Sequence, residues 1–235
     1  MISEIPEIVA RLRSSFDSGK TRPVAFRIQQ LKNLYWLIHE NEDALCHTLY
    51  LDLHRPKAEC FLLEIDFLKT ELLHIIRHVK SWTKDSPLSV PMALQFNSFR
   101  SQMVPLGEVL IISPWNFPIM LGLSPLAGAM AAGCTAVLKT SEISHFTSTL
   151  LAKLASQYLD SSCYHVINGD ADVATKLLAE KFDKILFTGG GRVARIVAKA
   201  AAENLTPVVL ELYCEVFSYA NSQGWQMPGY RNKAC

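Results

Sequence analysis

Residues 109–138 read VLIISPWNFPIMLGLSPLAGAMAAGCTAVL, and this stretch decides between two classes of protein. It includes no charged side chain from one end to the other, so a hydropathy window flags a membrane span. Pro114, Pro118 and Pro125 break the run into pieces too short to cross a bilayer as one regular helix. A strand, a turn, a buried helix and a second strand explain the stretch better.

The same alternation of short apolar runs and helix-competent stretches continues to residue 212. Runs rich in β-branched residues predict five strands, at 109–112, 135–138, 164–167, 184–187 and 208–210. The stretches between them predict helices at 120–132, 144–159, 172–179 and 192–204. Strands that alternate with helices indicate a five-stranded parallel sheet covered on both faces, and right-handed crossovers make it a doubly wound, Rossmann-like α/β domain.

The region before residue 86 is helical by its apolar period. One stripe near the N-terminus comprises Ile5, Ile8, Val9 and Leu12. A second helix is expected to start near Thr21 and Pro23 and to run through Ile38. A third is expected after Pro56, with one apolar side formed by Ile65, Leu68, Leu72, Ile75, Val79 and Trp82. The predicted division is a helical region at 1–85, a linker and hairpin segment at 86–107, a Rossmann-like domain at 108–212 and a divergent tail at 213–235.

Charge and cysteine usage narrow the possible partners and the compartment. The 23 Lys and Arg nearly balance the 22 Asp and Glu, so no broad basic field would attract nucleic acid or anionic lipid. Small ligands are therefore the expected partners. No secretory signal is visible between Met1 and Lys20, and six scattered cysteines without a C-x-x-C indicate reduced thiols in the cytoplasm.

A phosphate-binding loop is a candidate directly after the fourth predicted strand. Gly189, Gly191 and Ala194 fit the dinucleotide pattern G-x-G-x-x-A, although a glycine-rich turn is often only a turn. Glu211 follows Gly191 at the spacing that a dinucleotide fold uses for its ribose-binding acid. It fits that acid, a solvated strand end, or a general base in the crevice where ligands bind, and spacing does not choose among the three.

Polar side chains also follow the first two predicted strands. Asn116 lies between two prolines and two aromatics, where a rigid amide could donate to a developing oxyanion or merely cap a proline turn. Lys139 and Glu142 follow the second strand and could bind a sugar or simply be solvated. His74 and His78 are spaced as zinc ligands are, but without a carboxylate between them, so no metal site is predicted.

Four ordered motifs together resemble the aldehyde dehydrogenase superfamily. They are P-W-N-F-P at 114–118, A-A-G-C-T-A-V-L-K-T-S-E at 131–142, I-L-F-T-G-G-G at 185–191 and P-V-V-L-E-L at 207–212. The short helical N-terminus with D-L-H-R-P-K at 52–57 resembles the class 3 branch, which acts on fatty or aromatic aldehydes. The resemblance runs from about residue 23 to residue 212.

The resemblance implies oxidation of an aldehyde to a carboxylate with hydride transfer to NAD or NADP. Asn116 matches the family's oxyanion-stabilising asparagine and Glu211 its general base, which overrides the ribose reading of Glu211. Lys139 and Glu142 match the ribose-binding pair, and Trp115, Gly189 and Gly190 match residues beside the cofactor. A further expected partner is another chain, in a homo- or hetero-oligomer formed through the hairpin segment.

The chain departs from the family after Leu212. The family continues L-E-L-G-G-K, whereas Tyr213, Cys214 and Glu215 follow here, and neither Cys214 nor Cys235 has the context of the family's nucleophile. The expectation is therefore an aldehyde dehydrogenase truncated before its catalytic domain and inactive alone. The alternative is a non-catalytic nucleotide-binding or oligomer-interaction module.

Overall fold

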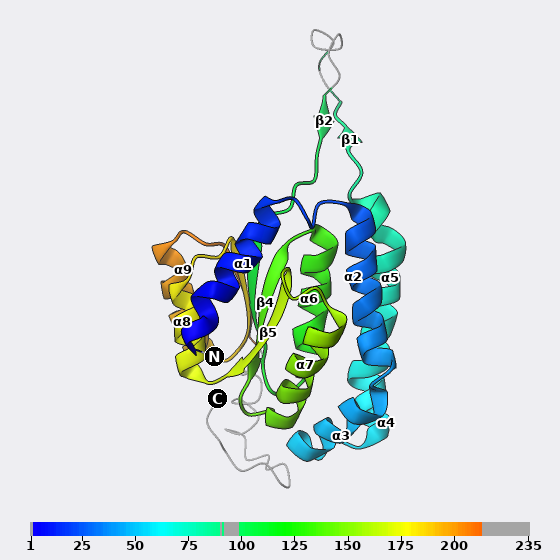
Figure 1. The fold of residues 1–235 in the computed structure, drawn as a ribbon, viewed down its shortest axis with the longest axis vertical. Helices are drawn as coiled ribbons and strands as arrows, with labels where there is room; N and C mark the ends of the chain where they lie inside the picture. The colour runs from blue at the N-terminus through cyan, green and yellow to red at the C-terminus, as the bar shows by residue number, and fades with distance from the viewer. Residues whose placement is uncertain (1, 90, 92–98, 213–235) are drawn as a thin grey trace.

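The computed structural model describes residues 2–89, 91 and 99–212, and its centre is a five-stranded parallel sheet (Figure 1). The strands are β3 (Glu108–Ile112), β4 (Thr135–Ser141), β5 (Tyr164–Gly169), β6 (Lys184–Gly189) and β7 (Val208–Leu212). Their spatial order is β5-β4-β3-β6-β7, and every pairing is parallel. This confirms the predicted doubly wound α/β fold, and each strand begins at or directly beside its expected first residue.

Helices cover both faces of this sheet. The linking helices are α6 (Met120–Ala132), α7 (His145–Tyr158), α8 (Ala171–Ala179) and α9 (Gly191–Glu203). The helices α6 and α7 pack on one face, while α8 and α9 pack on the other together with α1 (Ile5–Asp17), which follows the short 3-10 turn η1 (Ile2–Glu4). Stretch 109–138 is thus β3, α6 and β4, and no helix in residues 2–89, 91 and 99–212 is long and apolar enough to cross a membrane.

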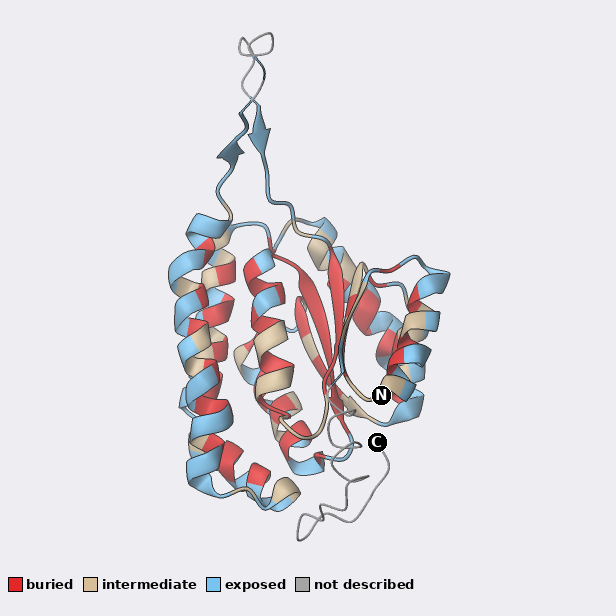
Figure 2. Cartoon of the chain, turned by 180° about the vertical axis from the view of Figure 1, so that it is seen from behind, coloured by how far each residue is buried: buried red, intermediate tan, exposed pale blue. Residues whose placement is uncertain are grey.

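Alternate residues of β3, β4, β5 and β6 belong to two separate cores. In β3, Val109 and Ile111 pack towards α6 and α7, whereas Leu110 and Ile112 pack towards α1, α8 and α9. This period of two is the pleat of a sheet buried on both sides. Figure 2 shows the central strands buried and the outer helix faces exposed.

An outer helical layer covers α6 and α7. It consists of α2 (Val24–His39), α3 (Glu42–Leu53), α4 (Lys57–Cys60) and α5 (Asp66–Trp82). A short π-helical segment, η2 (Phe61–Ile65), joins α4 to α5, where the sequence predicted one continuous helix. The apolar pattern did not predict α3, and Trp82, expected on the apolar side, is 48% exposed because it lies in the last turn of α5.

The segment between α5 and β3 forms a two-stranded antiparallel hairpin that projects from the body (Figure 1). Its described strands are β1 (Ser86–Pro87) and β2 (Arg100–Ser101), paired through Ser86 and Ser101. Both strands lie in the segment 86–107, for which the sequence predicted a linker and a hairpin, while residues 90 and 92–98 lie outside the described residues. The predicted tail at 213–235 lies outside them as well.

Gly133 ends α6 and shows why a glycine is needed there. Its φ of +82° is left-handed, and an added Cβ would lie 2.4 Å from the guanidinium carbon of Arg27. That buried guanidinium donates hydrogen bonds to the carbonyls of Thr21 and Ala131. The glycine therefore ends the helix and leaves room for the arginine that ties α2 to it.

Candidate functional site

The carboxyl ends of the five parallel strands lie at one edge of the sheet, and the strand order reverses between β3 and β6. The chain runs outward from β3 through β4 to β5 and then returns to β6 on the other side of β3. Ligands of doubly wound sheets bind where the strand order reverses in this way. The loops after β3 and β6 flank that point, and they contain Asn116 and the pair Gly189 and Gly190.

Asn116 lies in the loop between β3 and α6, and its backbone is held from one side. Its carbonyl oxygen accepts a hydrogen bond from the Arg55 guanidinium at 2.6 Å. The same guanidinium lies 4.7 Å from the ring centre of Phe117. The Asn116 side-chain oxygen is buried and has no hydrogen-bond partner among the described residues. Trp115, the predicted cofactor neighbour, is half-buried in this loop.

A buried carboxylate holds the end of the same loop. Glu64, on η2, is fully buried and accepts hydrogen bonds from the backbone N–H groups of Ile119 and Met120, each at 2.9 Å. It also forms an ion pair with Arg55. Burial raises the pKa of Glu64, and the two N–H groups and Arg55 oppose that rise. Glu64 therefore caps the N-terminus of α6 from a different part of the chain.

Lys139 and Glu142 come together at the end of β4. The Lys139 ammonium lies 3.3 Å from a Glu142 carboxylate oxygen, with the lysine side chain buried and the glutamate half-exposed. Burial lowers the pKa of Lys139, and Glu142 partly offsets this effect. In the helix that follows this pair, the N–H groups of Phe146 and Thr147 in the first turn of α7 donate hydrogen bonds to Asp52. Lys139 thus lies near the end of β4 and Glu142 directly follows the strand, while the start of the next helix, α7, is anchored by the end of α3.

Gly189 and Gly190 form the turn from β6 into α9. Gly190 is the N-cap residue of α9, its first turn holds no acidic residue, and no side chain of residues 2–89, 91 and 99–212 caps it. An added Cβ at Gly189 would lie 2.7 Å from the Phe187 ring, so the backbone packs closely over that ring. Within the described chain, the N-terminus of α9 therefore presents backbone N–H groups without a carboxylate on them.

Glu211 lies in the edge strand β7, where it is paired in register with Thr188 and exposed. Its neighbour Leu210 packs towards α8 and α9, so the pleat turns Glu211 to the face that α6 covers. Lys139 alternates with Leu138, which packs towards α6, and therefore faces the α9 side. The predicted residues divide between the two faces: Asn116 leads into α6 on the Glu211 side, while Lys139 shares a face with the N-terminus of α9.

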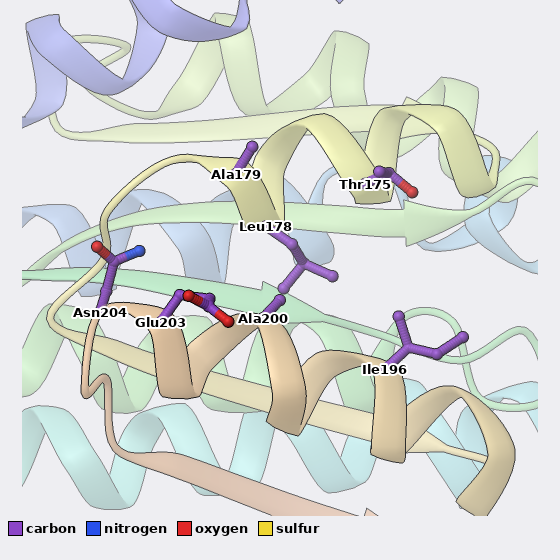
Figure 3. A pocket seen from close by; sticks show the side chains of 7 residues that line it. All are labelled: Thr175, Leu178, Ala179, Ile196, Ala200, Glu203 and Asn204. Carbon is purple, nitrogen blue, oxygen red and sulfur yellow. The ribbon is translucent and has the colours of Figure 1, made fainter.

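A shallow hollow of about 360 Å³ lies between α8 and α9 (Figure 3). Figure 3 labels its seven lining residues: Thr175, Leu178, Ala179, Ile196, Ala200, Glu203 and Asn204. None of the predicted site residues lines it. It is an open groove along the helix pair, on the same face of the sheet as Lys139.

The described cysteines lie inside the fold. Cys46, Cys60, Cys134 and Cys163 are all buried and free. Burial raises the pKa of Cys46 to about 12, and it also raises the pKa values of Cys60 and Cys163. A thiol with a raised pKa is a poor nucleophile because little of it ionises.

The histidine pair on α5 makes a ring contact. His74 and His78 have ring centres 4.2 Å apart, and Nδ1 of His78 is hydrogen-bonded to the His74 carbonyl. Within the ranges that the structure describes, no group of three or more His, Cys, Asp and Glu side chains is placed to hold a metal ion.

Three residues that hold the loops and helix ends beside the candidate site were not predicted from residue patterns: Asp52, Arg55 and Glu64. Asp52 and Arg55 stand in D-L-H-R-P-K, which carried only a family resemblance. Glu64 had a readable signal, because it lies four positions before Leu68 and therefore on the apolar stripe of the following helix. A carboxylate at such a position must find a partner in the core.

Comparisons with known proteins show the family of the chain. The model of the aldehyde dehydrogenase family matches residues 3–215. The chain is 47% identical over 205 residues to aldehyde dehydrogenase family 3 member I1, chloroplastic, from Arabidopsis thaliana, covering 87% of this chain and 37% of that protein. It is 40% identical over 234 residues to the dimeric NADP-preferring aldehyde dehydrogenase of Canis lupus familiaris, covering 100% and 49%.

Solved structures give the same result. The substrate-bound AldH of Staphylococcus aureus matches with a TM-score of 0.87 at 34% identity, over 88% of this chain and 45% of that one. An indole-3-acetaldehyde dehydrogenase in apo form matches with a TM-score of 0.80 at 27% identity, over 90% and 49%. The chain spans between 37% and 49% of the length of the curated relatives described here.

Proposed function

Because this chain belongs to the aldehyde dehydrogenase family, we propose that it binds NAD or NADP across the carboxyl edge of its sheet. The bound dinucleotide would serve the oxidation of an aldehyde to a carboxylate. When bound, the nicotinamide supplies the hydride acceptor. The residues of this chain bind and orient the two reactants.

The division of residues between the two sheet faces is the observation that carries this proposal. Lys139 and Glu142 form a pair of hydrogen-bonding groups suited to the hydroxyls of a ribose. On the same face, the N-terminus of α9 behind Gly189 and Gly190 suits a pyrophosphate. A dinucleotide held there would cross the switch point between β3 and β6 towards Asn116.

The residues proposed to act on the aldehyde and the water lie on the opposite face of the sheet. Asn116 would donate its amide N–H group to the oxygen of the aldehyde as negative charge develops there. Glu211 would take a proton from the attacking water, because an exposed carboxylate at the end of a parallel strand can reach the crevice. Trp115 would border the cofactor beside Asn116.

Two features that do not depend on the family also fit a dinucleotide. Lys139 is a buried cation whose partner, Glu142, is half-exposed, so its ammonium keeps donors for a ligand. The N-terminus of α9 presents backbone N–H groups that no side chain of the described residues caps. A ligand with hydroxyl and phosphate groups would satisfy both.

We propose that the chain by itself binds the cofactor without oxidising an aldehyde. Oxidation in this family needs a cysteine thiolate, and the four described cysteines are buried in the fold. An aldehyde is the proposed substrate only of a complete site. The cytoplasm is the proposed location, where free thiols stay reduced.

Titration calorimetry with NAD and NADP tests the binding proposal directly. We expect saturable binding of at least one of them, weakened about tenfold or more by Lys139→Ala, because one lost charge-assisted hydrogen bond is worth about 1.5–3 kcal/mol. Lys199→Ala, which removes an exposed lysine of α9, is the matched control and should bind as the parent does. Absence of binding of both nucleotides would end the proposal.

The alternative is a non-catalytic module that assembles with relatives through the projecting hairpin. The exposed apolar side chains at its base favour it, among them Met103 at 64% and Leu106 at 62%. An assay of NADH formation with long-chain and aromatic aldehydes, run with and without a full-length relative, separates the two. Co-purification without nucleotide binding would favour the module.

A further inference from the structure

One guanidinium lies between the two anchors of the Asn116 loop. One of the terminal nitrogens of Arg55 pairs with the Glu64 carboxylate, and the other donates to the carbonyl of Asn116 at 2.6 Å. The second oxygen of Glu64 accepts the N–H groups of Ile119 and Met120. Both ends of the segment 116–120 are therefore tied to the same buried ion pair.

The Asn116 side chain has no anchor of its own among the described residues. Its amide oxygen is buried without a hydrogen-bond partner there, so no bond to that oxygen fixes the orientation of the amide. The direction of the side chain is then set by the backbone that carries it. That backbone is held by Arg55 at residue 116, by the face of the Phe117 ring against the guanidinium, and by Glu64 at the start of α6.

We infer that Arg55 and Glu64 are positioning residues, which act through the loop backbone to aim the Asn116 amide. This inference rests on the proposed function, since it supplies the geometry that an oxyanion donor requires. The π-helical segment that carries Glu64 widens the helix at this point, and such segments are frequent at functional sites.

Contact with both the Glu64 carboxylate and the Asn116 carbonyl requires the two terminal nitrogens of an arginine guanidinium. A lysine could neutralise the Glu64 carboxylate, but its single ammonium does not have the planar pair of nitrogens that reach two partners in fixed directions. Charge compensation and loop positioning can therefore be separated by one substitution. Arg55→Lys keeps the charge beside Glu64 and removes the fixed bridge to the Asn116 carbonyl.

The test is nuclear magnetic resonance of the nucleotide-free chain, with the Asn116 side-chain amide assigned through Asn116→Ala. In Arg55→Lys we expect that amide to shift and the backbone amides of Asn116 and Phe117 to exchange about tenfold faster with solvent. The amides of Lys139 and Glu142 should not change. Lys57→Met is the matched control, because Lys57 is a nearby cation in an exposed pair with Asp43.

Unchanged Asn116 signals and exchange rates in a folded Arg55→Lys variant would overturn the inference. If that variant does not fold, the double substitution Arg55→Gln and Glu64→Gln removes both charges together, which buried pairs often tolerate. The double variant should show the same shift of the Asn116 amide, and its absence would also overturn the inference. Calorimetry on the same samples reports nucleotide binding independently, so failure of the proposed function is distinguished from failure of this inference.

Discussion

Three of the helices at the carboxyl edge begin on a carboxylate of the chain, whereas the fourth begins on a glycine. Glu64 caps α6, Asp52 caps α7, and Asp170 caps α8 through the N–H groups of Asp172 and Val173. The helix α9 begins on Gly190, with no side-chain cap from the described part of the chain. The capped ends stabilise the fold, whereas the open end keeps its partial positive charge for an external anion. The partial positive charge of a helix N-terminus thus stabilises the fold at α6, α7 and α8, and at α9 it is proposed to bind an anion.

Removing the most deeply buried cap should have the largest effect. Glu64→Ala leaves Arg55 without its partner and two N–H groups without an acceptor, so we expect a loss of about 3–5 kcal/mol in the free energy of unfolding. Urea denaturation followed by circular dichroism measures it. Glu59→Ala, at an exposed position just before η2, should stay within about 0.5 kcal/mol of the parent. Equal losses in the two variants would contradict the assigned role of Glu64.

Glu108 is a buried carboxylate that caps no helix of the described residues, and it can be compared with the capping carboxylates through the pH dependence of stability. Glu108 is fully buried at the start of β3, and burial raises its pKa to about 8, with Arg13 at 3.2 Å opposing the rise. A raised pKa means that the folded state holds the proton longer than the unfolded state. The contribution of Glu108 to the free energy of unfolding should therefore be largest below about pH 4.5. It should fall as the pH rises to about 8, by at most about 1.4 kcal/mol per pH unit.

Glu108→Gln isolates that contribution. The variant should show a flatter dependence of the urea midpoint on pH between about 4.5 and 8. Asp17→Asn, an exposed carboxyl at the end of α1, provides the control and should leave the pH profile unchanged. A profile for Glu108→Gln that overlays the parent would refute the assignment of the slope to this carboxyl.

A carboxylate introduced at the N-terminus of α9 should remove the difference between this helix and the three capped helices. Gly190→Asp would cap α9 like the others, since Gly190 already has the extended backbone of an N-cap residue at φ −77° and ψ 147°. We expect a gain in stability of a few tenths of a kcal/mol and a loss of about tenfold or more in nucleotide affinity by charge repulsion. Gly190→Ser adds a cap without charge and should keep most of the affinity. Unchanged nucleotide binding in Gly190→Asp would argue against α9 as the phosphate site.

Among the three carboxylate caps, the smallest loss of stability is expected at Asp170, which is exposed. Asp170→Ala removes the side chain that accepts the Asp172 and Val173 N–H groups, and should cost about 1 kcal/mol of stability. Asp170→Asn retains an acceptor and should recover most of it. Thermal denaturation of the two variants gives the difference, and a loss in Asp170→Asn as large as in Asp170→Ala would show that the charge rather than the cap matters.

The sheet could be predicted from the sequence because its signals are local. Each strand is a short β-branched run, and each helix between strands has the length that a crossover requires. The helix α3 was missed because its apolar positions do not form a clear stripe, and only Leu45, Cys46 and Leu49 are buried. Its place is set by packing against α7 and by Asp52 at the α7 N-terminus.

The site could be predicted in part for the same reason. Asn116, Lys139, Gly189 and Glu211 could be named as candidates because each lies within four residues after a predicted strand, and parallel strands deliver their carboxyl ends to one edge. The contacts of the Arg55 and Glu64 ion pair with the Asn116 loop could not be predicted from the sequence, because they join a helical segment to a loop that is distant in the sequence. Local pattern carries no information on such a pairing.

The sequence by itself determined the order of the strands and of the helices that link them, the two-sided burial of the sheet and the family to which the chain belongs. Only the tertiary structure decided which carboxylate meets which helix N-terminus, and hence that, within the described residues, α9 alone of these four helices has no side-chain cap. The physical reason is that strand and helix periods are set by neighbouring residues, whereas a buried charge takes its partner from whatever the folded chain brings within hydrogen-bond distance.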